Sequence, residues 1–112
     1  MGLAAKAINM DDTILHHFDD FQGFIGDKPY RGTAEMFFCP GCGYGHWFAT
    51  GPGGWTWDGD REKPTARPSI LQTITKEQGG MRCHLIMTDG QLQFLADSEH
   101  SLAGTTVPME AF

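Results

Sequence analysis

Cys39 and Cys42 lie two residues apart in the segment Cys-Pro-Gly-Cys-Gly, residues 39–43. Their thiolates can chelate one metal ion, and the proline and glycines favour a tight turn that brings backbone N–H groups close to the sulfurs. This is the chemistry of a zinc knuckle, which supplies half of the ligands of a tetrahedral Zn²⁺ ion. The remaining ligands must come from elsewhere in the chain.

The chain has three cysteines, and Cys83 is the third. A disulfide would leave one thiol over, whereas a site of three cysteines and one histidine uses every cysteine. The sequence therefore predicts that Cys39, Cys42 and Cys83 bind Zn²⁺ together with a histidine.

A β-hairpin predicted around Asp89-Gly90 places Cys83 relative to its neighbours. Asp-Gly is favoured in two-residue type I′ turns, and such a turn sets Leu85 opposite Phe94. In this register Cys83 lies on the apolar face of the hairpin, whereas His84 lies on the opposite face.

Three histidines are candidates for the fourth ligand. His100 follows the hairpin closely enough to reach Cys83 from a turn or helix start, and it is the preferred ligand. His84 would need a β-bulge to share the metal with Cys83. His46 has a usable spacing from Cys42 but lies along the outgoing strand, away from the knuckle tip. The predicted metal ligands are Cys39, Cys42, Cys83 and His100, with His84 and His46 as the alternatives.

The elements that must position these ligands are short strands. From residue 35 onward, apolar runs alternate with Gly, Pro and Asp-Gly turns, which is typical of antiparallel hairpins. We expect a mostly-β, zinc-ribbon-like domain over residues 35–112, with a short helical turn after His100. Residues 1–34 are predicted to form an N-terminal arm, in which Ile8, Leu15 and Phe18 have helical spacing.

Composition excludes several classes of function. The 112 residues carry a formal net charge of −6, and the eight basic residues are scattered. Nucleic-acid binding is therefore disfavoured, because it requires clustered cations. No apolar run approaches the ~20 residues of a membrane-spanning helix, and the N-terminal residues do not resemble a signal peptide. We expect a cytoplasmic protein.

Several motifs follow one another over residues 35–112. They are the knuckle of residues 39–46, Trp-Thr-Trp-Asp-Gly-Asp at 55–60, Pro-Thr-Ala-Arg-Pro-Ser at 64–69, Cys-His at 83–84, Thr-Asp-Gly-Gln-Leu-Gln-Phe at 88–94, and His-Ser-Leu-Ala-Gly-Thr-Thr-Val-Pro at 100–108. In combination they resemble a family of small proteins encoded by tailed phages and prophages. The resemblance implies a phage accessory protein with a structural zinc, acting in the host cytoplasm on a host protein. Members are often labelled ammonia monooxygenase, but this chain lacks the membrane helices and histidine-rich copper site that such an enzyme needs.

Three functions are compatible with a zinc site in such a chain. The first is a protein–protein interaction module that acts on a host or defence component. In such a module zinc supplements a small core. The second is a metal-dependent hydrolase with His46, His84 and Asp60 or Asp97 around an open zinc position. The third is a nucleic-acid-binding zinc ribbon with Trp47, Trp55 and Trp57 as stacking platforms. We recognise no Ser-His-Asp arrangement, phosphate loop or H-E-x-x-H motif, and three thiolates favour a closed zinc site. The sequence therefore favours the interaction module over an enzyme and leaves the partner and oligomeric state open.

Overall fold

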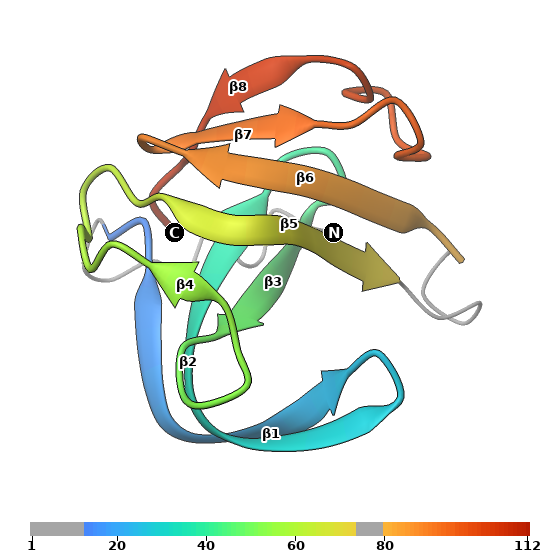
Figure 1. Ribbon diagram of the computed structural model, residues 1–112. Helices are drawn as coiled ribbons and strands as arrows, with labels where there is room; N and C mark the ends of the chain where they lie inside the picture. Colours follow the sequence, from blue (N-terminus) through green and yellow to red (C-terminus); the bar gives the residue numbers. More distant parts are fainter. Residues whose placement is uncertain (1–12, 74–79) are drawn as a thin grey trace.

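Two antiparallel β-sheets make up the described part of the protein (Figure 1). The structure is a computed structural model, and it describes residues 13–73 and 80–112. No helix occurs within these two ranges. The prediction of a mostly-β, antiparallel domain is therefore confirmed, and the described part is all-β.

The smaller sheet has three strands in the order β1-β2-β3. Its first turn contains Gly26, whose φ of 63° suits glycine. The second turn is the knuckle, where Cys39 at the end of β2 pairs with Tyr44 at the start of β3. The strands are β1 (His16–Ile25), β2 (Lys28–Cys39) and β3 (Tyr44–Ala49).

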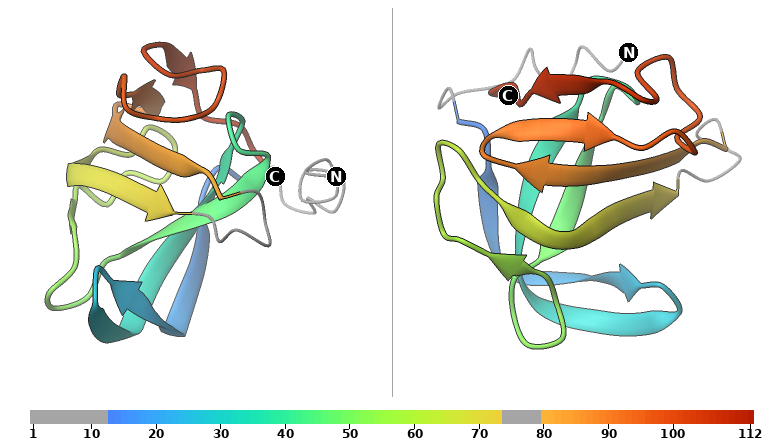
Figure 2. Two further views of the ribbon diagram at one scale, coloured as in Figure 1. Left: turned by 90° about the vertical axis from the view of Figure 1, so that its right-hand side faces the viewer. Right: turned by 45° about the horizontal axis from the view of Figure 1, so that its top comes forward.

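The larger sheet has five strands that neighbour one another in chain order. Figure 2 shows these strands side by side, with the β1–β2 hairpin lying beyond β5. They are β4 (Thr56–Trp57), β5 (Ala66–Thr73), β6 (Arg82–Thr88), β7 (Gln91–Phe94) and β8 (Thr106–Pro108).

The predicted hairpin register is confirmed between β6 and β7. Leu85 pairs with Phe94, and Thr88 pairs with Gln91. Asp89 and Gly90 both have positive φ, 51° and 77°, as a type I′ turn requires. The strand therefore presents Cys83 to the interior, where it is fully buried.

The core lies between the two sheets and is mostly aliphatic and aromatic. Along β6 and β7 alternate residues are buried, as expected for a sheet with one covered face. Two of the cysteines are part of this core. Its buried members are Leu15, Phe37, Cys39, Phe48, Ala66, Ile70, Cys83, Leu85, Met87, Leu92, Phe94 and Met109.

The finer expectations about the fold need correction. Two facing sheets replace the expected zinc ribbon. His16–Ile25 forms strand β1 in the segment expected to be an arm, because pairing with β2 overrides the helical spacing of Leu15 and Phe18. Ile8 lies outside the described residues. The boundary expected at residue 34 falls inside β2. After His100 the chain forms hydrogen-bonded turns, with N–H of Ala103 bonded to the His100 carbonyl at 3.2 Å, and no helix.

None of the described residues belongs to a helix long and apolar enough to cross a membrane.

Glu35 is a fully buried carboxylate that anchors the start of the fold. Its Oε1 accepts a hydrogen bond from Arg61 Nη2 at 2.9 Å, and its Oε2 lies 2.6 Å from Nδ1 of His17. Arg61 also donates to the carbonyl of Leu15 at 3.1 Å. A buried charge needs such partners, so this network ties β1, β2 and the segment after β4 together.

We expect the contribution of His17 to stability to depend on pH. The hydrogen bond to Glu35, followed by that to Asp19, raises the pKa of His17 above its ordinary value of 6.5. A raised folded-state pKa stabilises the fold fully below 6.5, and this stabilisation is lost as the pH rises through the folded-state pKa. Urea unfolding of the wild type and of His17→Gln should therefore differ more at pH 5.5 than at pH 9. An equal difference at both pH values would contradict this.

Candidate active site and metal cluster

Ser69, His84 and Asp97 form one hydrogen-bonded row. Oγ of Ser69 lies 2.9 Å from Nε2 of His84. On the other side of the ring, Nδ1 of His84 lies 3.1 Å from each carboxylate oxygen of Asp97. The carboxylate fixes Nδ1 as the protonated nitrogen, so Nε2 is free to accept the hydroxyl proton of the serine.

A bulge in β5 presents Ser69 to this row. The pairing of β5 with β6 shifts between Ala66 and Ile70. Pro68, directly before the serine, has no N–H to give to a ladder and suits such an irregular position. The carbonyl of Ser69 is held from the other side by the indole N–H of Trp55, at 3.2 Å. The serine is thus fixed at the surface of the sheet by residues of β5 and of the segment before β4.

His84 is held by its backbone as well as by its ring. Its N–H donates to Oγ of Ser98 at 2.9 Å, and its carbonyl accepts from the same hydroxyl at 2.9 Å. N–H of Leu95 also donates to this carbonyl, at 2.8 Å. The loop that follows β7 is therefore fastened to β6, and this brings Asp97 beside the imidazole.

A cleft of about 520 Å³ opens beside Ser69. It lies between β5 and the outer half of the β1–β2 hairpin, two segments that face each other across the lower part of Figure 1. None of its lining residues is charged. They are Phe21, Gln22, Gly23, Phe24, Ile25, Gly26, Trp47, Trp55, Ser69, Leu71, Gln72 and Thr73.

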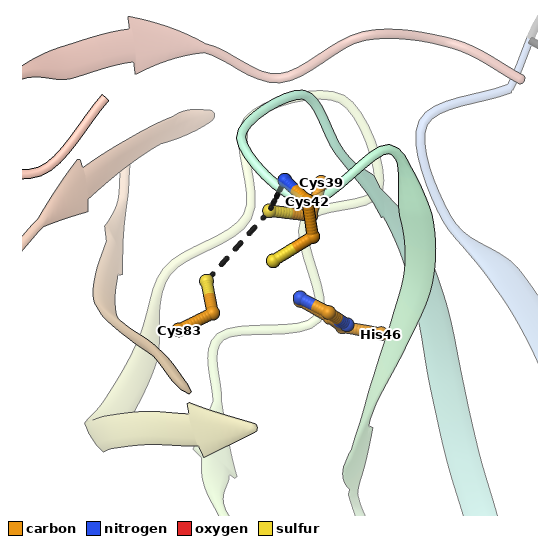
Figure 3. Close-up of side chains that lie close together, drawn as sticks. All are labelled: Cys39, Cys42, His46 and Cys83. Carbon is orange, nitrogen blue, oxygen red and sulfur yellow. Dashed lines mark hydrogen bonds between the residues drawn. The ribbon is translucent and has the colours of Figure 1, made fainter. Parts of the chain in front are cut away.

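A second group of side chains lies on the inner side of β6. Cys39 and Cys42 reach it from the knuckle, His46 from β3 and Cys83 from β6, and all four point toward one another (Figure 3). Their possible ligand atoms lie within 4.8 Å of each other. This cluster could hold a metal ion, and thiolates with an imidazole suit zinc.

The hydrogen bonding of His46 supports this fit. Its Nδ1 lies 3.2 Å from the carbonyl of Gly45, to which it can donate. Its Nε2 is buried and has no hydrogen-bond partner among the described residues. A buried nitrogen with a free lone pair facing three sulfurs is satisfied by a metal ion.

The three thiols do not share their protons equally. Hydrogen bonds from Cys42 and then Cys83 hold the pKa of Cys39 well below its usual range. The hydrogen bond to Cys39 raises the pKa of Cys42 to about 12, and hydrogen bonds to Cys39 and Cys42 raise that of Cys83. The three thiols thus interact with one another through their hydrogen bonds, as expected of side chains that share one site.

His100, the fourth ligand preferred from the sequence, lies beside this group of four. Its Nδ1 accepts the N–H of Leu102 at 3.2 Å, so its Nε2 carries the proton. That Nε2 lies 3.4 Å from Sγ of Cys83, to which it donates. His100 is thus a neighbour of the cluster that can hydrogen-bond to one of its sulfurs, and it is not one of the four clustered side chains. Its ring also covers Gly41, where a Cβ would come within 2.3 Å of it.

The serine, histidine and aspartate of the active site were missed in the sequence, where no Ser-His-Asp arrangement was recognised. The hairpin register did place His84 on the face opposite Cys83. The pairing of β5 with β6 was not predicted. It places Ser69 beside His84, although the two residues lie 15 positions apart in the sequence. The Pro-Ser dipeptide was the available signal for a serine at an irregular strand position.

A serine activated by a histidine–aspartate pair at the mouth of a cleft defines the site of a serine hydrolase. A family model matches residues 11–95, more than half of the 112-residue chain. The chain belongs to this family, BubE, described as the serine protease of a bacterial ubiquitination-like system. The match includes Ser69, His84 and all three cysteines, and ends shortly before Asp97.

This membership corrects the function inferred from the sequence. The resemblance to a tailed-phage family is wrong, and so is the accessory protein that was inferred to act by protein–protein interaction. The same match overturns the metal-dependent hydrolase and the nucleic-acid-binding zinc ribbon. Searches of curated proteins and of solved structures gave no match to the chain.

Proposed function

We propose that this protein is a serine protease that hydrolyses an amide bond in a protein of a bacterial ubiquitination-like system, with Ser69 as nucleophile. The observation that carries the proposal is the 2.9 Å contact from Ser69 Oγ to His84 Nε2, with Asp97 on the other ring nitrogen. The family description supplies the kind of system. The partner we propose is thus a protein substrate.

Ser69 and His84 carry out the proton transfers, and Asp97 orients and stabilises the imidazole without being protonated. His84 Nε2 takes the hydroxyl proton of Ser69 while Oγ forms a bond to the scissile carbonyl carbon. The imidazolium then gives this proton to the leaving amine, and an acyl-enzyme ester remains on Ser69. His84 then takes a proton from a water molecule whose oxygen attacks the ester carbonyl carbon, and it returns this proton to Oγ of Ser69 as the acid leaves. Asp97 stays ionised throughout and stabilises the imidazolium.

Zinc is the metal we propose for the cluster, with Cys39, Cys42, His46 and Cys83 as its ligands. Three thiolates and one imidazole complete a tetrahedron, which is typical of a structural zinc site. The ion would connect the knuckle of one sheet to β6 of the other. The three cysteines are free thiols in the structure, and a reducing cytoplasm, our proposed location, would keep them so.

The test of the proposed function is reaction with a fluorophosphonate, which phosphonylates an activated serine with loss of fluoride. We expect stoichiometric labelling, with the modified peptide containing Ser69. Labelling should be lost in His84→Ala and retained in Ser101→Ala, whose serine is exposed. Folded, metal-loaded protein that is not labelled, or is labelled at another serine, would contradict the proposal.

A further inference from the structure

β5 has a free edge directly beside Ser69, and the backbone of His84 shows how that edge is oriented. The N–H and C=O of His84 are bonded to Ser98 and Leu95, on the side of β7. Backbone groups alternate in direction along an antiparallel strand. The backbone groups of Cys83 and Leu85 therefore face β5.

Leu71 consequently points its own backbone groups outward. Cys83 and Leu85 pair with Gln72 and Ile70, so the N–H and C=O of Leu71, between them, are directed away from β6. On that outer side β4 pairs with β5 only as far as Arg67. Beyond it, no strand among residues 13–73 and 80–112 covers the edge.

The opposite wall of the cleft is apolar and closely packed. It is formed by residues 21–25 of β1, which is the edge strand of the smaller sheet, and by Gly26 in the turn that follows. The rings of Phe21 and Trp47 pack with centroids 4.4 Å apart. A Cβ at Gly23 would lie 2.8 Å from the Trp47 ring, so the absence of a side chain at Gly23 leaves room for this indole.

We propose that the substrate binds as an extended strand along the free edge of β5, between Ser69 and Thr73, with uncharged side chains turned toward Phe21 and Trp47. This rests on the proposed protease function and specifies its substrate. The free groups of Leu71 supply the main-chain hydrogen bonds, as in β-strand addition. The cleft offers no lining charge to pair with an ionised side chain, so charged residues are disfavoured there.

In this mode of binding, the contacts of the substrate repeat every two residues along the peptide. Alternate residues of an extended peptide face opposite sides, so every second side chain enters the cleft and every second N–H faces β5. The preference for uncharged residues and the need for an N–H should both alternate along the substrate.

The experiment uses acetylated tetrapeptide boronic acids, which bond to an activated serine, and measures how well they protect Ser69 from a fluorophosphonate. Leucine, alanine, lysine or aspartate is placed at each position in turn. We expect lysine and aspartate to weaken protection by about 10-fold or more at alternate positions only. Methylation of backbone nitrogens should weaken protection with the same alternation.

A lysine introduced on β5 tests whether this pattern arises from binding along β5. Leu71 is 54% exposed, so Leu71→Lys should fold, and it should improve protection by the aspartate peptides while weakening that by the lysine peptides. Gln93→Lys, at an exposed position of β7 outside the cleft, is the matched control and should change neither. Equal protection by all peptides, or tolerance of every N-methyl group, overturns the strand-addition proposal. Absence of fluorophosphonate labelling overturns the protease function itself.

Discussion

Replacing Ser69 by alanine is expected to lower kcat by about 10⁴-fold or more, because the variant has no nucleophile to form the acyl-enzyme. KM should change little, since the hydroxyl contributes mainly to the reaction and not to substrate binding. The measurement is steady-state hydrolysis of a neutral peptide coumarin amide by wild type and variant. The fold should be unaffected, because the main chain of Ser69 is fixed through its carbonyl by Trp55.

Two further variants separate catalysis from structure. Asp97→Asn should also lower kcat by about 10⁴-fold, because an amide favours the wrong tautomer of His84. Ser101→Ala should retain wild-type rates. Residual activity of Ser69→Ala above about one tenth of the wild type would rule out Ser69 as the nucleophile.

Loss of the metal cluster should have the second large effect, on folding and hydrolysis together. We expect one tightly held zinc ion per chain by elemental analysis. Cys83→Ser should lose both the ion and the cooperative unfolding transition, because a structural zinc contributes directly to folding free energy. Hydrolysis should be lost as well, since Cys83 and His84 are consecutive residues of β6.

Variants of His46 and His100 distinguish a metal ligand from a residue that hydrogen-bonds to a ligand. His46→Ala should release zinc, whereas His100→Ala should weaken zinc binding by only ~10–100-fold, as expected for a residue that hydrogen-bonds to a ligand. Cobalt-substituted protein should show the intense absorption of a tetrahedral thiolate site that added azide does not change. Metal-free protein with full activity and a cooperative melt, or zinc loss in His100→Ala alone, would contradict this assignment.

Local patterns made part of this structure predictable. The Asp-Gly turn set the pairing of β6 with β7, because a two-residue loop leaves one register. The knuckle cysteines were evident from their spacing. Cys83 could be added to them because its place on the apolar face of β6 follows from that register.

Non-local pairing explains what the sequence did not reveal. Ser69 meets His84 only because β5 pairs with β6 across an irregular register, which no short-range signal fixes. His46 was ranked behind His100 as the fourth ligand. His46 on β3 and Cys83 on β6 belong to different sheets, and only the packing of these sheets brings the two residues together. The choice between strand and helix over residues 16–18 likewise depended on pairing with β2.

Cys83 and His84 are consecutive residues, so the metal cluster and the Ser69–His84–Asp97 site both depend on the same register of β6. Neighbouring residues of a strand face opposite sides, so a slip of β6 by one residue would turn the imidazole toward the sulfurs and the thiol toward Ser69. A misaligned chain would thus lose a metal ligand and its catalytic base in the same step. If the proposed function is correct, only a molecule with correctly aligned strands would bind the metal ion and hydrolyse its substrate, and a misaligned molecule would be inactive.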